Sequence, residues 1–134
     1  MKSIDISPEL WPTFCEDFSR QHRGWLVTTS VLDGVSQTPL PERDQCHIHP
    51  TARDLPFAGL TLEPNGQDLV LLLGEGKLHV SEPIHRVRRI VMLETDDGAH
   101  AGVRIEKSDE TGVLVRFRVP AHPERLNGVA ASER

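Results

Sequence analysis

The sequence predicts a mainly β domain, a small barrel or a curled antiparallel sheet of about six strands, with one helix at its N-terminus. Apolar residues recur at helical spacing between Trp11 and His22. From Trp25 onward, short runs of β-branched and apolar residues are separated by turn residues. The 134 residues, 37% of them hydrophobic, suffice for one apolar core. We expect one domain over residues 1–120 and a disordered tail over residues 121–134.

The first predicted element is an amphipathic helix. Because a proline inside a helix removes an internal hydrogen bond, we expect a loose turn over residues 8–11 and a regular helix from Pro12. Basic residues near its end suit the negative end of the helix dipole, and Gly24 supplies a left-handed stop. The apolar face, at positions i, i+3, i+4, i+7 and i+11, carries Trp11, Phe14, Cys15, Phe18 and His22.

The next stretch divides into a strand and an irregular segment. Residues 25–32 are rich in β-branched side chains and end at an Asp-Gly turn signal, which predicts a strand. Residues 35–53 hold three prolines and no sustained apolar period. This predicts either a long loop or an irregular edge strand.

A hairpin is predicted for residues 57–62 and 68–73, around a turn at residues 64–66. The second of these strands is apolar without polar alternation, so we expect both of its faces to be covered. A short strand then begins at Leu78 and stops at Pro83.

The last third of the chain contains one ambiguous segment and one clear hairpin. Ile84, Val87 and Ile90 have the spacing of a helix, whereas the apolar run that follows, before an Asp-Asp-Gly turn, is typical of a strand. We predict a strand over residues 87–95. Alternating apolar and polar residues over 103–106 and 113–119 predict two more strands, joined as a hairpin.

Composition excludes several classes of protein. The longest apolar run is far shorter than the ~20 residues of a membrane helix, and the N-terminus lacks the apolar stretch of a secretory signal. We therefore expect a cytoplasmic protein without a membrane partner, whose Cys15 and Cys46 are reduced thiols. A net charge of −5 and only two Trp and four Phe, which fall in the predicted core, disfavour nucleic-acid binding.

Two motifs resemble a known family. The helix and first strand read Trp-x-x-Phe-x-x-x-Phe-Ser-Arg-x-His-x-Gly-Trp from Trp11 to Trp25, and Ala-Arg-Asp-Leu-Pro-Phe-x-Gly follows at residues 52–59. Together they resemble a family of small bacterial proteins known only as a domain of unknown function, over residues 6–118. The resemblance implies one compact domain and brings no activity, cofactor or catalytic residue with it.

A candidate metal site lies in the proline-containing stretch. In an extended segment His47 and His49 point to the same side, a spacing that suits two ligands of one Zn²⁺. Cys46 would join them only through a bulge or turn. A further ligand has to come from a distance: His79, His85, His100 or Asp44. The alternative is a proline-bounded loop that happens to hold histidines.

A second candidate site is the basic run His85, Arg86, Arg88 and Arg89. As a strand, Arg86 and Arg88 would share one face, with His85 and Arg89 on the other. Such a cluster would bind phosphate, another anion or a partner through charge-assisted hydrogen bonds. The alternative is a solvated edge strand whose charges prevent unwanted pairing.

Two residues of the predicted helix are expected to have structural roles. His22 lies one turn past Phe18 on the buried side, so we expect it to donate a hydrogen bond to the last helix carbonyls. Cys15 lies on the apolar face and reads as an inert core thiol. The sequence contains no nucleophile elbow, phosphate-binding loop or His-Glu-x-x-His motif.

Three hypotheses for function follow. The preferred one is a non-enzymatic binding or interaction module that contacts a protein partner, a second copy of itself or a small anion. The second is a metal-dependent protein, for example a zinc-dependent hydrolase, with His47 and His49 as ligands. The third is nucleic-acid or anion binding through the basic run, in which Arg88 and Arg89 contact phosphate. No cofactor other than zinc is expected.

Overall fold

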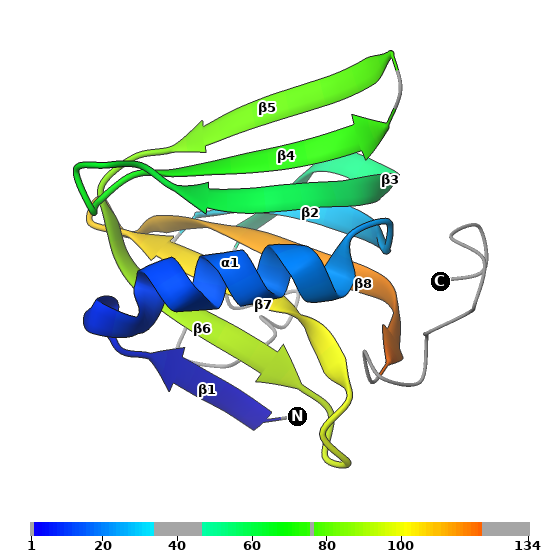
Figure 1. Cartoon of the computed structure of the whole chain (residues 1–134), viewed down its shortest axis with the longest axis horizontal. Coiled ribbons are helices and arrows are strands. Elements are labelled where there is room, and N and C mark those ends of the chain that lie inside the picture. Colours follow the sequence, from blue (N-terminus) through cyan, green and yellow to red (C-terminus); the bar gives the residue numbers. More distant parts are fainter. Residues whose placement is uncertain (1, 34–46, 76, 122–134) are drawn as a thin grey trace.

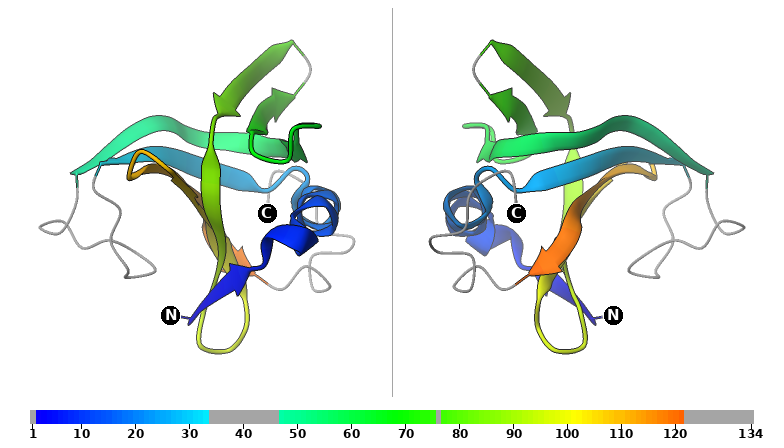
Figure 2. Two further views of the ribbon diagram at one scale, coloured as in Figure 1. Left: turned by 90° about the vertical axis from the view of Figure 1, so that its left-hand side faces the viewer. Right: turned by 90° about the vertical axis from the view of Figure 1, so that its right-hand side faces the viewer.

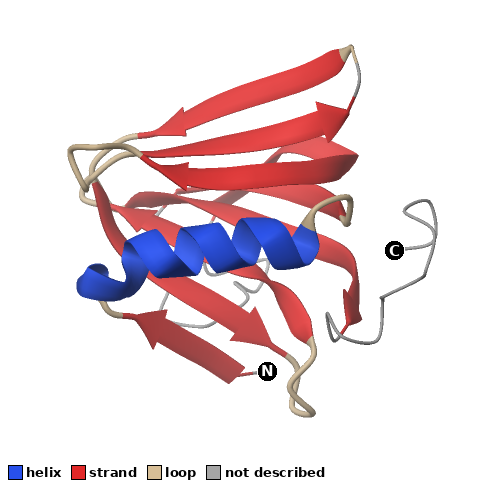
Figure 3. Ribbon diagram, in the orientation of Figure 1, coloured by secondary structure: helices blue, strands red, loops and turns tan. Residues whose placement is uncertain are grey.

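The computed structural model describes residues 2–33, 47–75 and 77–121 of the chain. It contains one antiparallel sheet and one helix that lies across the concave face of the sheet (Figure 1). Coloured by secondary structure, the described chain is mostly strand (Figure 3). The predicted class, mainly β with one N-terminal helix, is therefore confirmed.

The helix α1 spans Trp11–His22 and follows a 3-10 turn, η1, at Pro8–Leu10. The predicted turn before the helix is confirmed, and the helix begins one residue earlier than predicted. Pro12 lies in the first helical turn, where its missing amide hydrogen has no intrahelical acceptor to lose. Beyond the helix, Gly24 adopts φ 88°, the left-handed conformation that ends the helical path.

Every strand pairs with its neighbours in antiparallel fashion, in the order β1-β6-β7-β8-β2-β3-β4-β5, and the sheet is not closed. The predicted number of about six strands is wrong, because the described chain has eight. Figure 2 shows α1 nearly end-on, inside the bend of the curled sheet. The strands are β1 Lys2–Ile6, β2 Leu26–Asp33, β3 His47–Leu62, β4 Leu69–Glu75, β5 Leu78–Ile84, β6 Val87–Glu94, β7 His100–Lys107 and β8 Thr111–Ala121.

Two segments differ from, or refine, the prediction. The strand β1 was not predicted; it pairs with β6 and forms one edge of the sheet. Residues 47–53 belong to β3 and pair with β2 in a register that shifts twice, so the predicted irregular edge strand fits them better than a loop. Residues 34–46 of the predicted loop and residues 122–134 of the predicted tail lie outside the described residues.

Only one face of β4 is fully buried. Leu69, Leu71 and Leu73 face the core, whereas Val70 and Leu72 are half-buried. The expectation that both faces are covered is wrong, because α1 packs on the concave side of the sheet alone (Figure 1). The apolar sequence of β4 therefore does not indicate that a second layer covers its other face.

The later strands agree with the sequence. The segment β6 is a strand and not the alternative helix, and β7 and β8 form the predicted hairpin. The main core lies between α1 and the sheet, where Phe18 packs edge-on against Phe57, with ring centroids 5.3 Å apart, and stacks on Phe117 at 5.8 Å. Burial of such aromatic rings supplies much of the apolar area that holds the helix in place.

A reciprocal pair of hydrogen bonds joins α1 to β3. The Ser19 hydroxyl donates to the Leu60 carbonyl oxygen at 3.0 Å and accepts from the Leu60 amide at 2.8 Å. Each bond satisfies a backbone group of the sheet that would otherwise face the helix unpaired. This contact determines where along the sheet the helix lies.

A two-residue crossing leads from β5, at one edge of the sheet, to β6 near the other. Arg86 adopts a left-handed conformation there, with φ 54°. Its amide donates to Asp68 Oδ1 at 2.9 Å, and His85 Nδ1 contacts Asp68 Oδ2 at 3.2 Å. These hydrogen bonds to the charged form hold the pKa of Asp68 down, to about 2.

Close packing at Gly102 of β7 generates a testable prediction. A Cβ atom at this position would lie 2.2 Å from the Val115 carbonyl oxygen of the neighbouring strand, whereas a Cβ at Gly59 would come no closer than 3.7 Å, to Ser19 Oγ. We expect Gly102→Ala to lower the free energy of unfolding by about 3 kcal/mol or more, measured by urea denaturation. The matched control Gly59→Ala should change it by less than about 1 kcal/mol, and equal effects of the two substitutions would contradict the register of β7 and β8.

Candidate functional site

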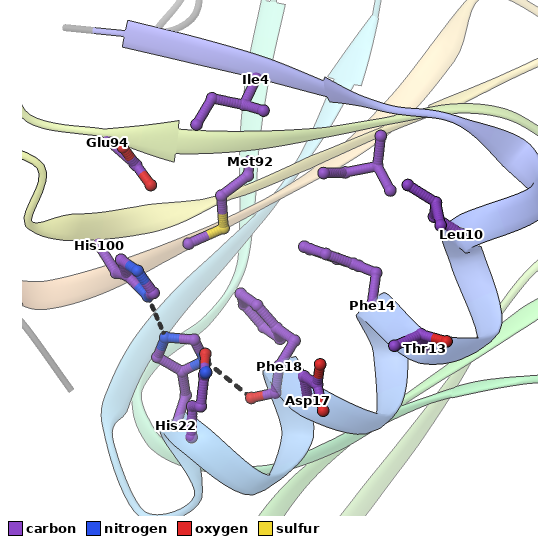
Figure 4. Close-up of a pocket in the computed structure, with 12 residues that line it drawn as sticks. Ile4, Leu10, Thr13, Phe14, Asp17, Phe18, His22, Met92, Glu94 and His100 are labelled. Carbon is purple, nitrogen blue, oxygen red and sulfur yellow. Dashed lines mark hydrogen bonds between the residues drawn. The ribbon is translucent and has the colours of Figure 1, made fainter. Parts of the chain in front are cut away.

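A pocket of about 360 Å³ opens between α1 and the strands β1, β6 and β7 (Figure 4). Its volume is within the range of small-molecule sites. Figure 4 shows Phe14 and Phe18 pointing from α1 toward Met92 on β6. The apolar lining residues are Ile4, Ile6, Leu10, Phe14, Phe18 and Met92, and the polar ones are Thr13, Asp17, Gln21, His22, Glu94 and His100.

Simple periodicities bring these residues together. On the helix, a spacing of four residues places Phe14, Phe18 and His22 on one face. On the strands, alternation places Ile4 and Ile6 of β1 on the same side of the sheet as Met92 of β6, which is paired with Ile4. The open side of the pocket is apolar too, because Ile4 is 42% and Leu10 is 55% exposed.

A histidine pair closes one end of the pocket. His22 Nδ1 lies 2.7 Å from the Phe18 carbonyl oxygen, so this nitrogen carries the hydrogen and donates it. The neutral ring then has an acceptor at Nε2, which lies 2.7 Å from His100 Nδ1 and receives its hydrogen. One backbone carbonyl thus determines the tautomer of both imidazoles when the pair is neutral.

Aromatic rings surround His22. Its ring centroid lies 4.3 Å from that of Phe18, 4.6 Å from that of Trp25 and 4.8 Å from that of Phe117. The residue is fully buried. The pKa of His22 is lowered from 6.5 to about 3, mainly by burial; the hydrogen bond to the Phe18 carbonyl opposes this shift, and the nearby His100 contributes to it. His22 is therefore neutral at pH 7.

Two carboxylates line the pocket. Asp17 Oδ1 accepts a hydrogen bond from Arg20 Nη2 at 2.7 Å, on the exposed side of the helix. Glu94 is half-buried at the end of β6, where the backbone register places it opposite His100 of β7 and Lys2 of β1. Two acidic side chains thus belong to the lining of the pocket, and no lysine or arginine of the described residues does.

The predicted metal ligands are only partly placed. His47 and His49 lie on β3, where they pair with Asp33 and Val31 of β2, but their side chains and the whole of Cys46 lie outside the described part of the structure. Among the described side chains, no group of three or more His, Cys, Asp or Glu is arranged to hold a metal ion. The zinc site therefore stays a prediction.

The predicted basic cluster has a different geometry from the one expected. Arg86 precedes β6 in a left-handed conformation, and a register shift after Val87 places Arg88 and Arg89 close to one carboxylate, Glu106 of β7. The expectation that Arg88 and Arg89 face opposite sides of a regular strand is wrong, because the irregular register interrupts the alternation of side chains.

Glu106 is a nearly buried carboxylate that binds three guanidinium groups. Its distances are 3.1 Å to Arg104, 3.3 Å to Arg89 and 3.5 Å to Arg88, and its side chain is 4% exposed. Arg89 also contacts Asp5 of β1 at 2.6 Å. Two of the arginines predicted to bind an anion therefore already bind carboxylates of the protein itself.

The interpretations of the helix residues agree with the structure. His22 donates to a carbonyl in the last turn of the helix, as predicted. Cys15 is buried, and burial raises the pKa of its thiol to about 11, as for an inert core thiol. The pocket itself was not predicted from the sequence. Two features of the sequence could have indicated it: the apolar alternation of Ile4 and Ile6, which predicts a strand, and the position of His100 after a turn.

Comparisons with known protein families, curated proteins and solved structures found no significant match to this chain. The resemblance carried by the motif from Trp11 to Trp25 therefore stays a prediction. In the residues that the structure describes, the single α-helix has 12 residues, and no helix is long and apolar enough to cross a membrane.

The buried His22 predicts a specific dependence of stability on pH. The unfolded chain binds a proton at His22 below pH 6.5, whereas the folded protein does not until about pH 3. Stability should therefore fall as the pH drops below 6.5, by about 2 kcal/mol at pH 5 from this group alone. Urea denaturation at pH 7 and pH 5 measures the loss.

The control for this prediction is His22→Gln, whose side chain does not titrate. His100, Asp17 and Glu94, which share the pocket with His22, are present in both proteins, so the difference between the two proteins reports on His22. The variant should be less stable at pH 7 and lose less stability between pH 7 and pH 5. Identical losses would contradict the burial of a neutral His22.

A second prediction concerns the nearly buried Glu106. Replacing it with glutamine removes the carboxylate from three arginines and should destabilise the protein by about 3 kcal/mol in urea denaturation. The exposed ion pair of Asp5 with Arg89 provides the control: Asp5→Asn should cost less than about 1 kcal/mol. A Glu106→Gln variant as stable as Asp5→Asn would contradict this account of the cluster.

Proposed function

We propose that the protein is a non-enzymatic binding module that holds a small, mainly apolar molecule in the pocket between α1 and the strands β1, β6 and β7. The observation that carries the proposal is the combination of an aromatic and aliphatic lining with six polar side chains, of which His22, Glu94 and His100 lie toward one end of the pocket (Figure 4). That combination is typical of sites for small organic ligands.

The dimensions of the pocket support a ligand of modest size. Its volume of about 360 Å³ corresponds to roughly a dozen water molecules at liquid density. An aromatic ring with a short side chain fits this space. Transfer of such a ring from water onto Phe14, Phe18 and Met92 is favourable, at roughly 25 cal/mol for each Å² of apolar surface buried.

The hydrogen bonding at the closed end also favours binding. Both ring nitrogens of His22 are held in hydrogen bonds with protein groups, the Phe18 carbonyl and His100. An imidazole held in this way orients its neighbour His100 rigidly at the wall of the pocket. A rigid polar wall lowers the entropy cost of ligand binding.

The test uses 2-phenylethanol as a neutral apolar probe and the methyl signal of Met92 as the reporter. The chain has two methionines, so a protein labelled with ¹³C at the methionine methyl groups gives a simple NMR spectrum in which Met92 reports on the pocket. We expect saturable shifts of the Met92 signal, caused by the aromatic ring of the probe.

A matched pair of variants locates the binding. Ile4 lines the pocket on one edge strand, and Val80 lies on the opposite edge strand with similar exposure, 42% against 38%. Ile4→Trp fills the pocket and should weaken binding of 2-phenylethanol at least about tenfold, whereas Val80→Trp should leave it unchanged. The proposal fails if the Met92 signal does not respond to the probe, or if both variants bind equally well.

A further inference from the structure

We infer that the ligand of this pocket carries a positively charged amine on its aromatic or aliphatic body, with the amine beside Glu94. The inference rests on the proposed function and adds the chemical class of the ligand. It is based on the charge and the hydrogen-bonding character of the polar side of the pocket.

The charged groups at the pocket are acidic. Of the described residues that line it, Asp17 and Glu94 carry negative charge, none is lysine or arginine, and His22 is neutral at pH 7. Arg20 occupies one oxygen of Asp17 on the exposed side of the helix, so Glu94 is the principal charge available to a ligand. A carboxylate at the border of an apolar cavity attracts a cation more strongly than it would in bulk water.

The position of Glu94 favours a donor as well. The backbone register pairs His100 with Glu94, so the two side chains belong to adjacent strands at the same end of the pocket. An ammonium group, which only donates, matches the carboxylate of Glu94, whereas a ligand carboxylate would face Glu94 with like charge.

Lys2 is the cation nearest to Glu94 in the backbone register, and its effect has to be weighed. It lies directly opposite Glu94 on β1, but its side chain is exposed and forms no ion pair with Glu94 in the described structure. An exposed, hydrated ammonium on an edge strand screens a half-buried carboxylate weakly. Glu94 therefore keeps its capacity to bind a cationic ligand.

The apolar part of the pocket suits an aromatic body. Phe14 and Phe18 are stacked, with ring centroids 5.4 Å apart, and both line the cavity. A third ring can stack offset or edge-on against them, while its short side chain extends toward Met92 and Glu94. The stacked rings and the carboxylate of Glu94 together favour a ligand that resembles an arylalkylamine.

The experiment compares three probes that share a phenylethyl body and differ in the charge of the end group: 2-phenylethylamine, 2-phenylethanol and 3-phenylpropionate. Their affinities are measured at pH 7.5 from the Met92 methyl signal of the full chain. We expect the amine to bind about tenfold more tightly than the alcohol, and the carboxylate to bind most weakly. In Glu94→Gln this advantage of the amine should fall to about twofold or less.

Two controls distinguish the inference about the amine from the proposal that the pocket binds a ligand. The affinity of 2-phenylethanol should be the same in Glu94→Gln as in the unaltered protein, which shows that the pocket is intact. Glu16→Gln, on the helix surface away from this pocket, should keep the full preference for the amine.

Three results would count against the inference or its premise. If the alcohol binds and the amine binds no more tightly than the alcohol, the inference is overturned while the proposed function stands. A preference for the amine that persists in Glu94→Gln also overturns it. If none of the three probes moves the Met92 signal, the proposed function fails with it.

Discussion

The structure depends on one packing arrangement: the apolar face of a single helix covers the concave side of an open sheet. Because the sheet is not closed, its inner face would otherwise meet water along β2, β3 and β8. Trp11, Cys15 and Phe18 of α1 supply the missing apolar surface, and the reciprocal hydrogen bonds of Ser19 with Leu60 position it. The helix removes this face of the sheet from solvent, as closure of the sheet does in a barrel.

The candidate pocket lies where this cover is incomplete. Trp11 at the start of α1 donates a hydrogen bond to the Ile6 carbonyl oxygen of the edge strand β1, but the pocket opens beyond this contact and keeps an apolar wall with exposed Ile4 and Leu10. Close by, His22 is fully buried as a neutral base, which costs stability at acidic pH. The buried His22 therefore has two structural roles. It binds the Phe18 carbonyl near the end of the helix, and it orients His100 beside Glu94 in the wall of the pocket.

The basic run in β6 illustrates how tertiary contacts change the meaning of a local charge pattern. In sequence, Arg88 and Arg89 are unopposed by nearby acids and resemble an anion site. In the fold, Glu106 of the next strand and Asp5 of the edge strand bind them. The arginines thus hold β1, β6 and β7 together on the side of the sheet away from α1. When the acidic partners of a basic cluster lie in distant strands, the sequence around the cluster does not reveal the ion pairs.

The sequence by itself determined the elements with strong local signals. The helix face, the stop at Gly24, β6 and the hairpin of β7 and β8 depend on periodicity and turn residues, which act over a few positions. Only the tertiary structure decided whether the sheet closes, that residues 2–6 form a strand, and that Met92, Glu94 and His100 meet α1. Those features require contacts between residues distant in the chain, and alternation over five residues does not specify its partner.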